Sequence, residues 1–184
     1  VRSATVFSPT AAHREGFARE MAAKLKFPVI AAESAEAAAR GHDVVVAATS
    51  SRSREPVLRG AWLDRCRLLC AVGSTRPEAV EVDADCFRGA GLVVVDSQRA
   101  VEEAGDLQAA VQGGAAPAER QATLAQLVTG KAAVPAQGRV VFKSVGTALQ
   151  DLALAARYFE LLGPSAAARI GSLASLKQPV SQRR

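Results

Sequence analysis

Small and hydroxyl-bearing residues recur where apolar stretches of the sequence end. These endings read SPT (8–10), TSS (49–51), GST (73–75) and SVG (144–146). Ligands bind beyond the carboxyl ends of parallel strands, where small residues let a flat cofactor approach the backbone and hydroxyls supply hydrogen bonds. The pattern therefore favours a cofactor-binding edge. Ordinary turn chemistry stays an alternative at each position, because the same residue types crowd turns.

The first of these endings bears on which cofactor would bind. The sequence has no glycine-rich G-x-G-x-x-G turn, so the opening strand fits the second position of a dinucleotide-binding fold. At the end of that strand an Asp or Glu would bind the 2′-hydroxyl of NAD. Ser8, Pro9 and Thr10 stand there instead, and Arg14 follows. We therefore expect NADP(H) in preference to NAD(H); the other interpretation of Arg14 is an exposed helix residue.

The elements that carry these endings alternate between short β-branched runs and helical stretches, which is typical of βαβ units and a mostly parallel sheet. The continuous apolar run 43–49 predicts a strand buried on both faces. Phe17, Met21 and Leu25 recur at a spacing of four residues, which predicts one buried helix face. The expected strands are 4–8, 29–32, 43–49, 67–73, 92–97 and 140–144. The expected helices are 11–26, one that Ser34 caps and that runs to residue 40, 83–88, 100–112, 121–128 and 147–162.

Composition excludes several classes of protein. The 184 residues are 49% apolar and 4% aromatic, which suits one α/β domain with a core. No apolar run approaches the ~18 residues of a membrane helix, so we expect no membrane partner. The net charge of +5 is scattered rather than gathered into a basic stripe, so we expect no nucleic-acid partner.

The cysteines and histidines bear on metal and on compartment. Cys66, Cys70, Cys86, His13 and His42 do not have the spacing of a zinc site, so we expect no metal. Three cysteines in or near apolar segments indicate buried, reduced thiols. Reduced thiols are the default of the cytoplasm, and we expect a soluble cytoplasmic protein.

Four motifs carry a family resemblance: TSSRSREPVLRGAWL (49–63), AVGSTRPEAVEVDAD (71–85), GLVVVDSQ (91–98) and FKSVGTALQDLALA (142–155). These motifs resemble those of the ornithine cyclodeaminase/mu-crystallin family. They occur in the order found in that family and together cover nearly all of the chain up to about residue 162. The resemblance implies a Rossmann NAD(P)-binding domain joined to a substrate and dimerisation domain. It assigns 1–144 to a partial NAD(P)-binding domain and 145–162 to a helix returning to the second domain; we expect 163–184 to be a flexible tail.

The resemblance also implies site residues. Thr75 stands where ornithine cyclodeaminases have an acid/base Asp, and a threonine cannot replace that group near neutral pH. With a hydroxyl at this position, the sequence resembles the mu-crystallin branch, whose members are NADPH-dependent ketimine reductases. The resemblance implies that Thr75 forms a hydrogen bond near the reacting centre. Ser8 and Thr10 match 2′-phosphate contacts, although Pro9 replaces an expected Arg. Positions that match the cofactor lining are Thr49, Ser50, Val72, Gly73, Ser144 and Val145, with core packing the alternative for the two valines.

By the same resemblance, the sequence begins where the second Rossmann strand begins. We expect the first strand, its phosphate turn and the N-terminal substrate domain to be missing, which leaves strands 4–8 and 43–49 facing across a gap. The expected activity of the full-length parent, a homodimer, is NAD(P)H-dependent reduction of small cyclic or α-imino acids, and the 184 residues alone would be inactive. The alternatives are an ornithine cyclodeaminase, an alanine dehydrogenase-type enzyme, or a non-catalytic NADPH-binding crystallin-like protein.

Overall fold

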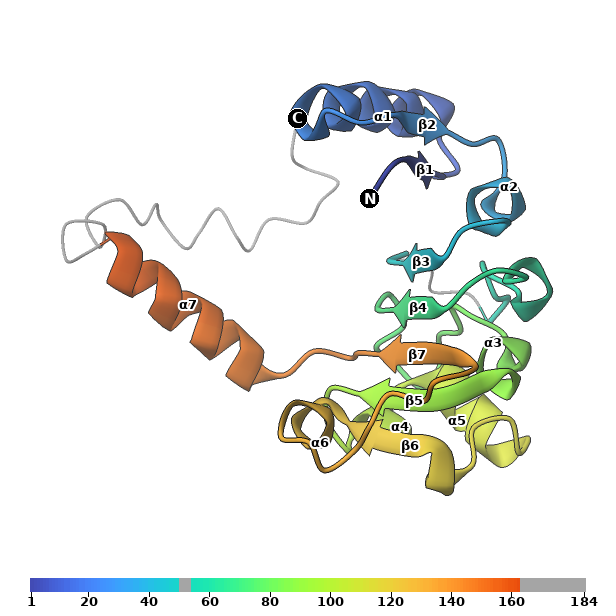
Figure 1. Cartoon of the computed structure of the whole chain (residues 1–184), viewed down its shortest axis with the longest axis vertical. Helices are drawn as coiled ribbons and strands as arrows, with labels where there is room; N and C mark the ends of the chain where they lie inside the picture. The colour runs from blue at the N-terminus through green and yellow to red at the C-terminus, as the bar shows by residue number, and fades with distance from the viewer. Residues whose placement is uncertain (50–53, 163–184) are drawn as a thin grey trace. The chain divides into compact units, whose positions relative to one another are not determined.

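The computed structural model describes residues 1–49 and 54–162 (Figure 1). Contacts divide the chain into two units, Val1–Gly146 and Thr147–Arg184. The described strands belong to the first unit, and the described part of the second is helix α7 (Ala148–Leu162). The predicted tail 163–184 lies outside the described residues.

A five-stranded sheet forms the centre of the first unit. All its neighbouring strands run parallel, in the order β3-β4-β7-β5-β6, which Figure 1 shows as a stack of arrows. The predicted α/β class with a mostly parallel sheet is therefore confirmed. The strands are β3 (Val44–Ala47), β4 (Leu68–Ala71), β7 (Arg139–Lys143), β5 (Ala90–Val95) and β6 (Gln121–Thr123).

A separate two-stranded parallel sheet opens the chain. Strands β1 (Ala4–Val6) and β2 (Val29–Ala31) pair with each other, and α1 (Ala11–Leu25) connects them. As expected, β1 and β3 are not paired in the described part of the chain. Helix α2 (Ala35–Ala39) links the two sheets in sequence, and the Ser34 hydroxyl caps it by accepting a hydrogen bond from the Ala37 amide.

Two predictions of burial are wrong. Phe17 and Leu25 are each 50% exposed, because the two-stranded sheet is too small to cover a helix of this length; only Ala18 of α1 is buried. Strand β3 is buried on one face rather than two, with Val44 55% and Val46 63% exposed. Its other face contributes Val45 and Ala47 to the core, and no described helix covers the outer face at this strand.

The main core lies between one face of the five-stranded sheet and helices α3 (Ala84–Arg88) and α5 (Gly105–Gln112). Fully buried side chains from the sheet and from both helices meet there, including Leu69, Val93, Val141, Phe87 and Leu107. On the opposite face, α6 (Leu124–Val128) covers a smaller cluster around Leu92, Val94 and Ala122.

Two predicted helices differ in the structure. The expected helix 100–112 is two helices, α4 (Ala100–Glu103) and α5, because Ala104 is extended and Gly105 lies so close to Pro77 that an added Cβ would be 2.3 Å from its carbonyl oxygen. The expected helix 121–128 begins with strand β6. Helix α6 starts only after Thr123, whose side chain forms a capping box with Gln126.

The remaining described elements are two short 3₁₀ helices, η1 (Gly60–Trp62) and η2 (Ala118–Arg120), and α7. Thr147 caps α7: its amide donates to Gln150 Oε1 over 2.9 Å and its hydroxyl accepts from the Gln150 amide. Neither α7 nor any other helix among the described residues is long and apolar enough to cross a membrane.

Candidate functional site

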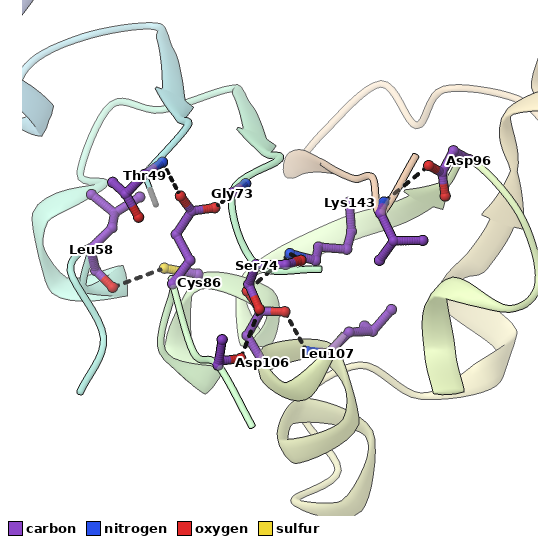
Figure 2. A network of polar contacts seen from close by, with 12 residues as sticks. Thr49, Leu58, Gly73, Ser74, Cys86, Asp96, Asp106, Leu107 and Lys143 are labelled. Carbon is purple, nitrogen blue, oxygen red and sulfur yellow. Dashed lines mark hydrogen bonds and ion pairs between the residues drawn. The ribbon is translucent and has the colours of Figure 1, made fainter. Parts of the chain in front are cut away.

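Three neighbouring strands of the five-stranded sheet end at one edge. The register places Ala47 of β3 beside Ala71 of β4, and Ala71 beside Lys143 of β7. The segments that follow carry Thr49, Gly73 and Ser144, so the structure brings together the predicted residues of these three strand ends. Figure 2 shows this edge.

One buried carboxylate joins the first two strand ends. Glu81 is 1% exposed, and its Oε1 accepts a hydrogen bond from the Thr49 amide over 2.6 Å while Oε2 accepts from the Gly73 amide over 2.7 Å. Amides of Val57 and Leu58 donate to the Glu81 carbonyl and hold its backbone. The two loops are thereby held at a fixed spacing.

Gly73 and Thr49 make this edge close-packed and polar. A Cβ on Gly73 would lie 2.0 Å from Glu81 Oε1 and 2.3 Å from the Thr49 carbonyl oxygen, so only glycine fits. The buried Thr49 hydroxyl has no hydrogen-bond partner among the described residues. A buried polar group without a partner is rare and costly, which points to a partner outside the described chain.

A buried ion pair supports the turn after β4. Lys143 Nζ lies 3.1 Å from Asp106 Oδ2 with both side chains 0% exposed, and it also donates to the Ser74 carbonyl over 2.7 Å. Burial raises the pKa of the Asp106 carboxyl, and the Lys143 charge opposes that shift. Figure 2 shows the Lys143 side chain reaching toward Ser74 and Asp106. Thr75 follows Ser74 and is exposed.

The end of β7 is held by a second carboxylate. Asp96, just beyond β5, accepts hydrogen bonds from the Ser144 hydroxyl and from the amides of Val145 and Gly146 at one oxygen. Val145 is also packed against the main core, as the core-packing alternative expected. Val72 is half-buried between Ala71 and Gly73.

The remaining predicted residues lie at the end of β1, in the smaller sheet. Arg14 folds back so that Nη1 donates to the carbonyls of Ser8, over 3.1 Å, and Pro9, over 3.4 Å, with its guanidinium 5.8 Å from the centre of the Phe7 ring. Thr10 precedes α1, and its hydroxyl makes no capping bond. These contacts stay within one short segment. Ser50 lies outside the described residues.

Four residues that organise the edge were not predicted: Glu81, Asp96, Asp106 and Lys143. Two had a sequence signal, because Asp96 and Lys143 are charged residues at the ends of apolar strands. Glu81 lies inside the 71–85 motif, but nothing local marks it as buried. Among the described residues, no group of three or more His, Cys, Asp or Glu side chains is placed to hold a metal ion.

Comparison with known proteins shows which family the chain resembles. Residues 2–162 match the model of the ornithine cyclodeaminase/mu-crystallin family. The ketimine reductase mu-crystallin of Mus musculus is 31% identical over 138 residues, which cover 75% of this chain and 42% of that protein. Delta(1)-pyrroline-2-carboxylate reductase 2 of Burkholderia ambifaria is 42% identical over 111 residues, covering 60% and 33%.

The solved structures agree. The Thermococcus litoralis Delta(1)-pyrroline-2-carboxylate reductase, in complex with NADH and L-proline, has a TM-score of 0.78 at 30% identity, covering 86% of this chain and 50% of that chain. This structure supports the predicted Rossmann-like fold, as does that of an archaeal alanine dehydrogenase dimer with bound NAD, with a TM-score of 0.71 at 23% identity, covering 94% of this chain and 52% of that chain. The chain spans about half the length of the relatives it matches, or less. It belongs to the ornithine cyclodeaminase/mu-crystallin family.

Proposed function

We propose that the whole protein is an NAD(P)H-dependent reductase of small cyclic or α-imino acids. Relatives named as ketimine reductase and Delta(1)-pyrroline-2-carboxylate reductase support the reaction class, and the NADH and L-proline of the Thermococcus litoralis complex support the cofactor and substrate classes. The bound nicotinamide would supply a hydride to the imine carbon. The observation on this chain that carries the proposal is the edge shared by three strand ends, where the buried Thr49 hydroxyl has no hydrogen-bond partner among the described residues.

The residues at this edge fit a nicotinamide dinucleotide. Thr49 has a buried hydroxyl with no hydrogen-bond partner among the described residues, and Gly73, packed against Glu81 and the Thr49 backbone, holds the two loops close together. Val72 and Val145 add apolar surface, and Ser144 and Ser50 complete the proposed lining. A flat cofactor that lies against backbone needs this combination of small, hydroxylic and apolar groups.

Thr75 is the proposed catalytic residue. Its exposed hydroxyl follows the anchored Ser74, and it would donate a hydrogen bond to the bound imino acid near the reacting carbon. A threonine does not exchange protons near neutral pH, so it would orient the substrate rather than act as an acid or base. This role suits imine reduction better than the cyclisation of ornithine.

The proposed cofactor preference is NADP(H) over NAD(H). Arg14, in α1, is half-buried and donates to the Ser8 carbonyl just beyond β1, and the exposed Thr10 hydroxyl is not used as a helix cap. No acidic residue stands between positions 7 and 14 to repel a 2′-phosphate. An arginine and two hydroxyls are groups that bind a phosphate.

The domain assignment rests on the same proposal. Residues 1–144 would form part of the NAD(P)-binding domain, and α7, within 145–162, would belong to a substrate and dimerisation domain of a cytoplasmic homodimer. The apolar side chains of α7 support an interface role: Leu149, Leu152 and Phe159 are 74%, 66% and 62% exposed.

The test is oxidation of NADPH and NADH by the whole protein, with Delta(1)-pyrroline-2-carboxylate and its six-membered homologue as substrates. The 184-residue chain is assayed in parallel. We expect imine-dependent NADPH oxidation by the whole protein and no rate from the 184 residues alone. Tight NADPH binding without turnover of any imine would favour the crystallin-like binding protein. Ammonia released from ornithine, or pyruvate formed from alanine, would favour the two amino-acid enzymes.

Two substitutions at position 75 sharpen the assay. Thr75→Val removes the hydroxyl and keeps the shape, and we expect kcat with an imine to fall about tenfold or more. Thr75→Ser keeps the hydroxyl and should retain most of the activity. If Thr75→Val reduced the imine as fast as Thr75→Ser, the Thr75 hydroxyl would have no role in the reaction.

A further inference from the structure

Three charged side chains that are almost completely buried lie next to the turn that carries Thr75. Glu81 and Asp106 are each 1% exposed and Lys143 is 0% exposed. They come from three different parts of the chain: the segment before α3, helix α5 and strand β7. Burying charge is costly, and well-packed apolar side chains in such positions are often as stable or more stable. Stability alone therefore does not account for the three charges.

Their hydrogen bonds converge on two consecutive residues. Glu81 accepts from the Gly73 amide over 2.7 Å, and Lys143 donates to the Ser74 carbonyl over 2.7 Å. The Ser74 hydroxyl donates to the Ala79 carbonyl, also over 2.7 Å. An amide, a carbonyl and a side chain of this turn are thus all bound to the protein interior.

Asp106 completes the arrangement without touching the turn. Its Oδ2 is 3.1 Å from Lys143 Nζ, and its Oδ1 accepts from the Leu107 amide over 2.9 Å at the start of α5. It compensates the Lys143 charge and directs the ammonium group toward Ser74. The next residue along the chain, Thr75, is exposed at the edge of the sheet.

We infer that Glu81, Lys143 and Asp106 are positioning residues that fix the Gly73–Ser74 backbone and thereby hold the Thr75 hydroxyl in place for the substrate. The catalytic part of this inference rests on the proposed function. The positioning part concerns the order of Thr75 in the protein without cofactor or substrate.

The first experiment uses the double variant Asp106→Leu/Lys143→Met in the threonine-methyl-labelled whole protein, studied by NMR relaxation. The variant removes both charges of the Lys143–Asp106 ion pair together, so it preserves the fold better than either single change. It also removes the donor to the Ser74 carbonyl. We expect the order parameter of the Thr75 methyl group to fall clearly while that of Thr123, held in the α6 capping box, is unchanged.

A matched control is Asp85→Ala/Arg88→Ala, which removes an exposed ion pair of 2.9 Å in α3. It should leave the Thr75 methyl unchanged. If the Thr75 methyl in Asp106→Leu/Lys143→Met is as ordered as in the parent, the inference is overturned, because a merely stabilising ion pair would give that result.

A second variant covers the case in which the double variant does not fold. Glu81→Gln keeps the ion pair and the side-chain volume, but turns an amide donor toward the Thr49 or Gly73 amide. We expect the rate of hydrogen exchange at the affected amide to rise about tenfold, because that amide loses one buried hydrogen bond. The order parameter of the Thr75 methyl group should fall as well. Unchanged exchange and order would also overturn the inference.

The kinetic test separates this inference from the proposed function. In the whole protein, the double variant should lower kcat with an imine about tenfold, because Thr75 is proposed to bind the substrate. The KM for NADPH should stay within about twofold, because Glu81 still binds the Gly73 amide in this variant. A rise in the KM for NADPH as large as the fall in kcat would contradict the assignment of the three charges to the positioning of Thr75. If the parent reduces no imine, the proposed function fails, while the relaxation result still decides whether the three charges position Thr75.

Discussion

The Ser144 hydroxyl donates a hydrogen bond of 2.6 Å to Asp96 Oδ2, joining the ends of the adjacent strands β7 and β5. The same oxygen accepts from the amides of Val145, over 3.0 Å, and Gly146, over 2.7 Å, and Oδ1 accepts from the Ser97 amide. Gly146 has a φ of 82°, a conformation that favours glycine. One carboxylate therefore shapes the whole turn that leaves the sheet.

Asp96→Ala should loosen this turn. Hydrogen bonds to a charged group contribute about 1.5–3 kcal/mol, so we expect a loss of that size in the free energy of unfolding, measured with urea. Amide exchange at Val145 and Gly146 should rise at the same time. Asp85→Ala, at an exposed carboxylate in α3, is the control and should change the free energy by less than about 0.5 kcal/mol. Equal effects of the two variants would contradict the assigned role of Asp96.

Lys143→Met alone should be far more harmful than the paired change. It leaves the Asp106 carboxylate buried without its partner, and breaking a buried pair in this way costs about 3–5 kcal/mol of unfolding free energy. Asp106→Leu/Lys143→Met should recover most of that loss. Additive losses, measured by denaturant unfolding of both variants, would show that the two charges do not depend on each other.

Gly73→Ala should destabilise the fold, because the new Cβ would meet Glu81 Oε1 at 2.0 Å and the Thr49 carbonyl at 2.3 Å. Overpacking of this kind costs about 1–3 kcal/mol or more. Gly16→Ala is the matched control, because nothing lies within 4 Å of its added Cβ. Alanine in place of glycine inside a helix should raise the free energy of unfolding by about 0.5–1 kcal/mol. Thermal melts of the two variants should shift in opposite directions, and a shift in the same direction would contradict the geometry.

Cys86 should make stability depend on alkaline pH. Burial raises the pKa of its thiol far above the ordinary value of 9.0, and the nearby Asp83 carboxylate adds to the shift. The unfolded chain ionises this thiol first, so its contribution to stability is complete below the ordinary pKa and is lost as pH rises above it. The slope is at most about 1.4 kcal/mol per pH unit. Cys86→Ala lacks this thiol, so its stability deficit relative to the parent should narrow between pH 8 and pH 10. A constant deficit in urea unfolding would contradict the prediction.

Arg14→Ala tests the proposed 2′-phosphate contact. Removing a charged hydrogen-bond donor should weaken NADPH binding about tenfold and leave NADH binding unchanged. Arg19→Ala, an exposed arginine of the same helix, controls for net charge. Titration calorimetry of the whole protein with both cofactors gives the comparison. Equal weakening by the two variants would assign the effect to general electrostatics.

The sequence predicted most of the elements in their order, strand β6 and the division between α4 and α5 excepted, because periodicity and caps are local signals. Ser34 caps α2 as predicted. Asp83 was predicted as the first residue of helix 83–88; in the structure it precedes α3 and its side chain accepts a capping bond from the Cys86 amide. Burial was harder to predict, because it depends on what packs against a segment. The run of valines in β3 suits a strand covered on both faces, yet Val44 and Val46 are exposed in this structure.

At the candidate site, the strand ends were predictable and their supports were not. Thr49, Gly73 and Ser144 follow apolar runs, so their shared edge follows from parallel pairing. Glu81 reaches that edge from a loop, across 32 residues to Thr49. No local pattern reveals such a partner, because the contact exists only after the chain has folded.

The strand order has a consequence for synthesis on the ribosome. Strand β7 lies between β4 and β5 but is the last of the five to be made. Until it emerges, β3 with β4 and β5 with β6 are two unjoined pairs, each with an unpaired edge that another nascent chain can bind. Pairing across so long a stretch of sequence is slow. We expect the newly made protein to need a chaperone until Arg139–Lys143 inserts and joins the two halves of the sheet.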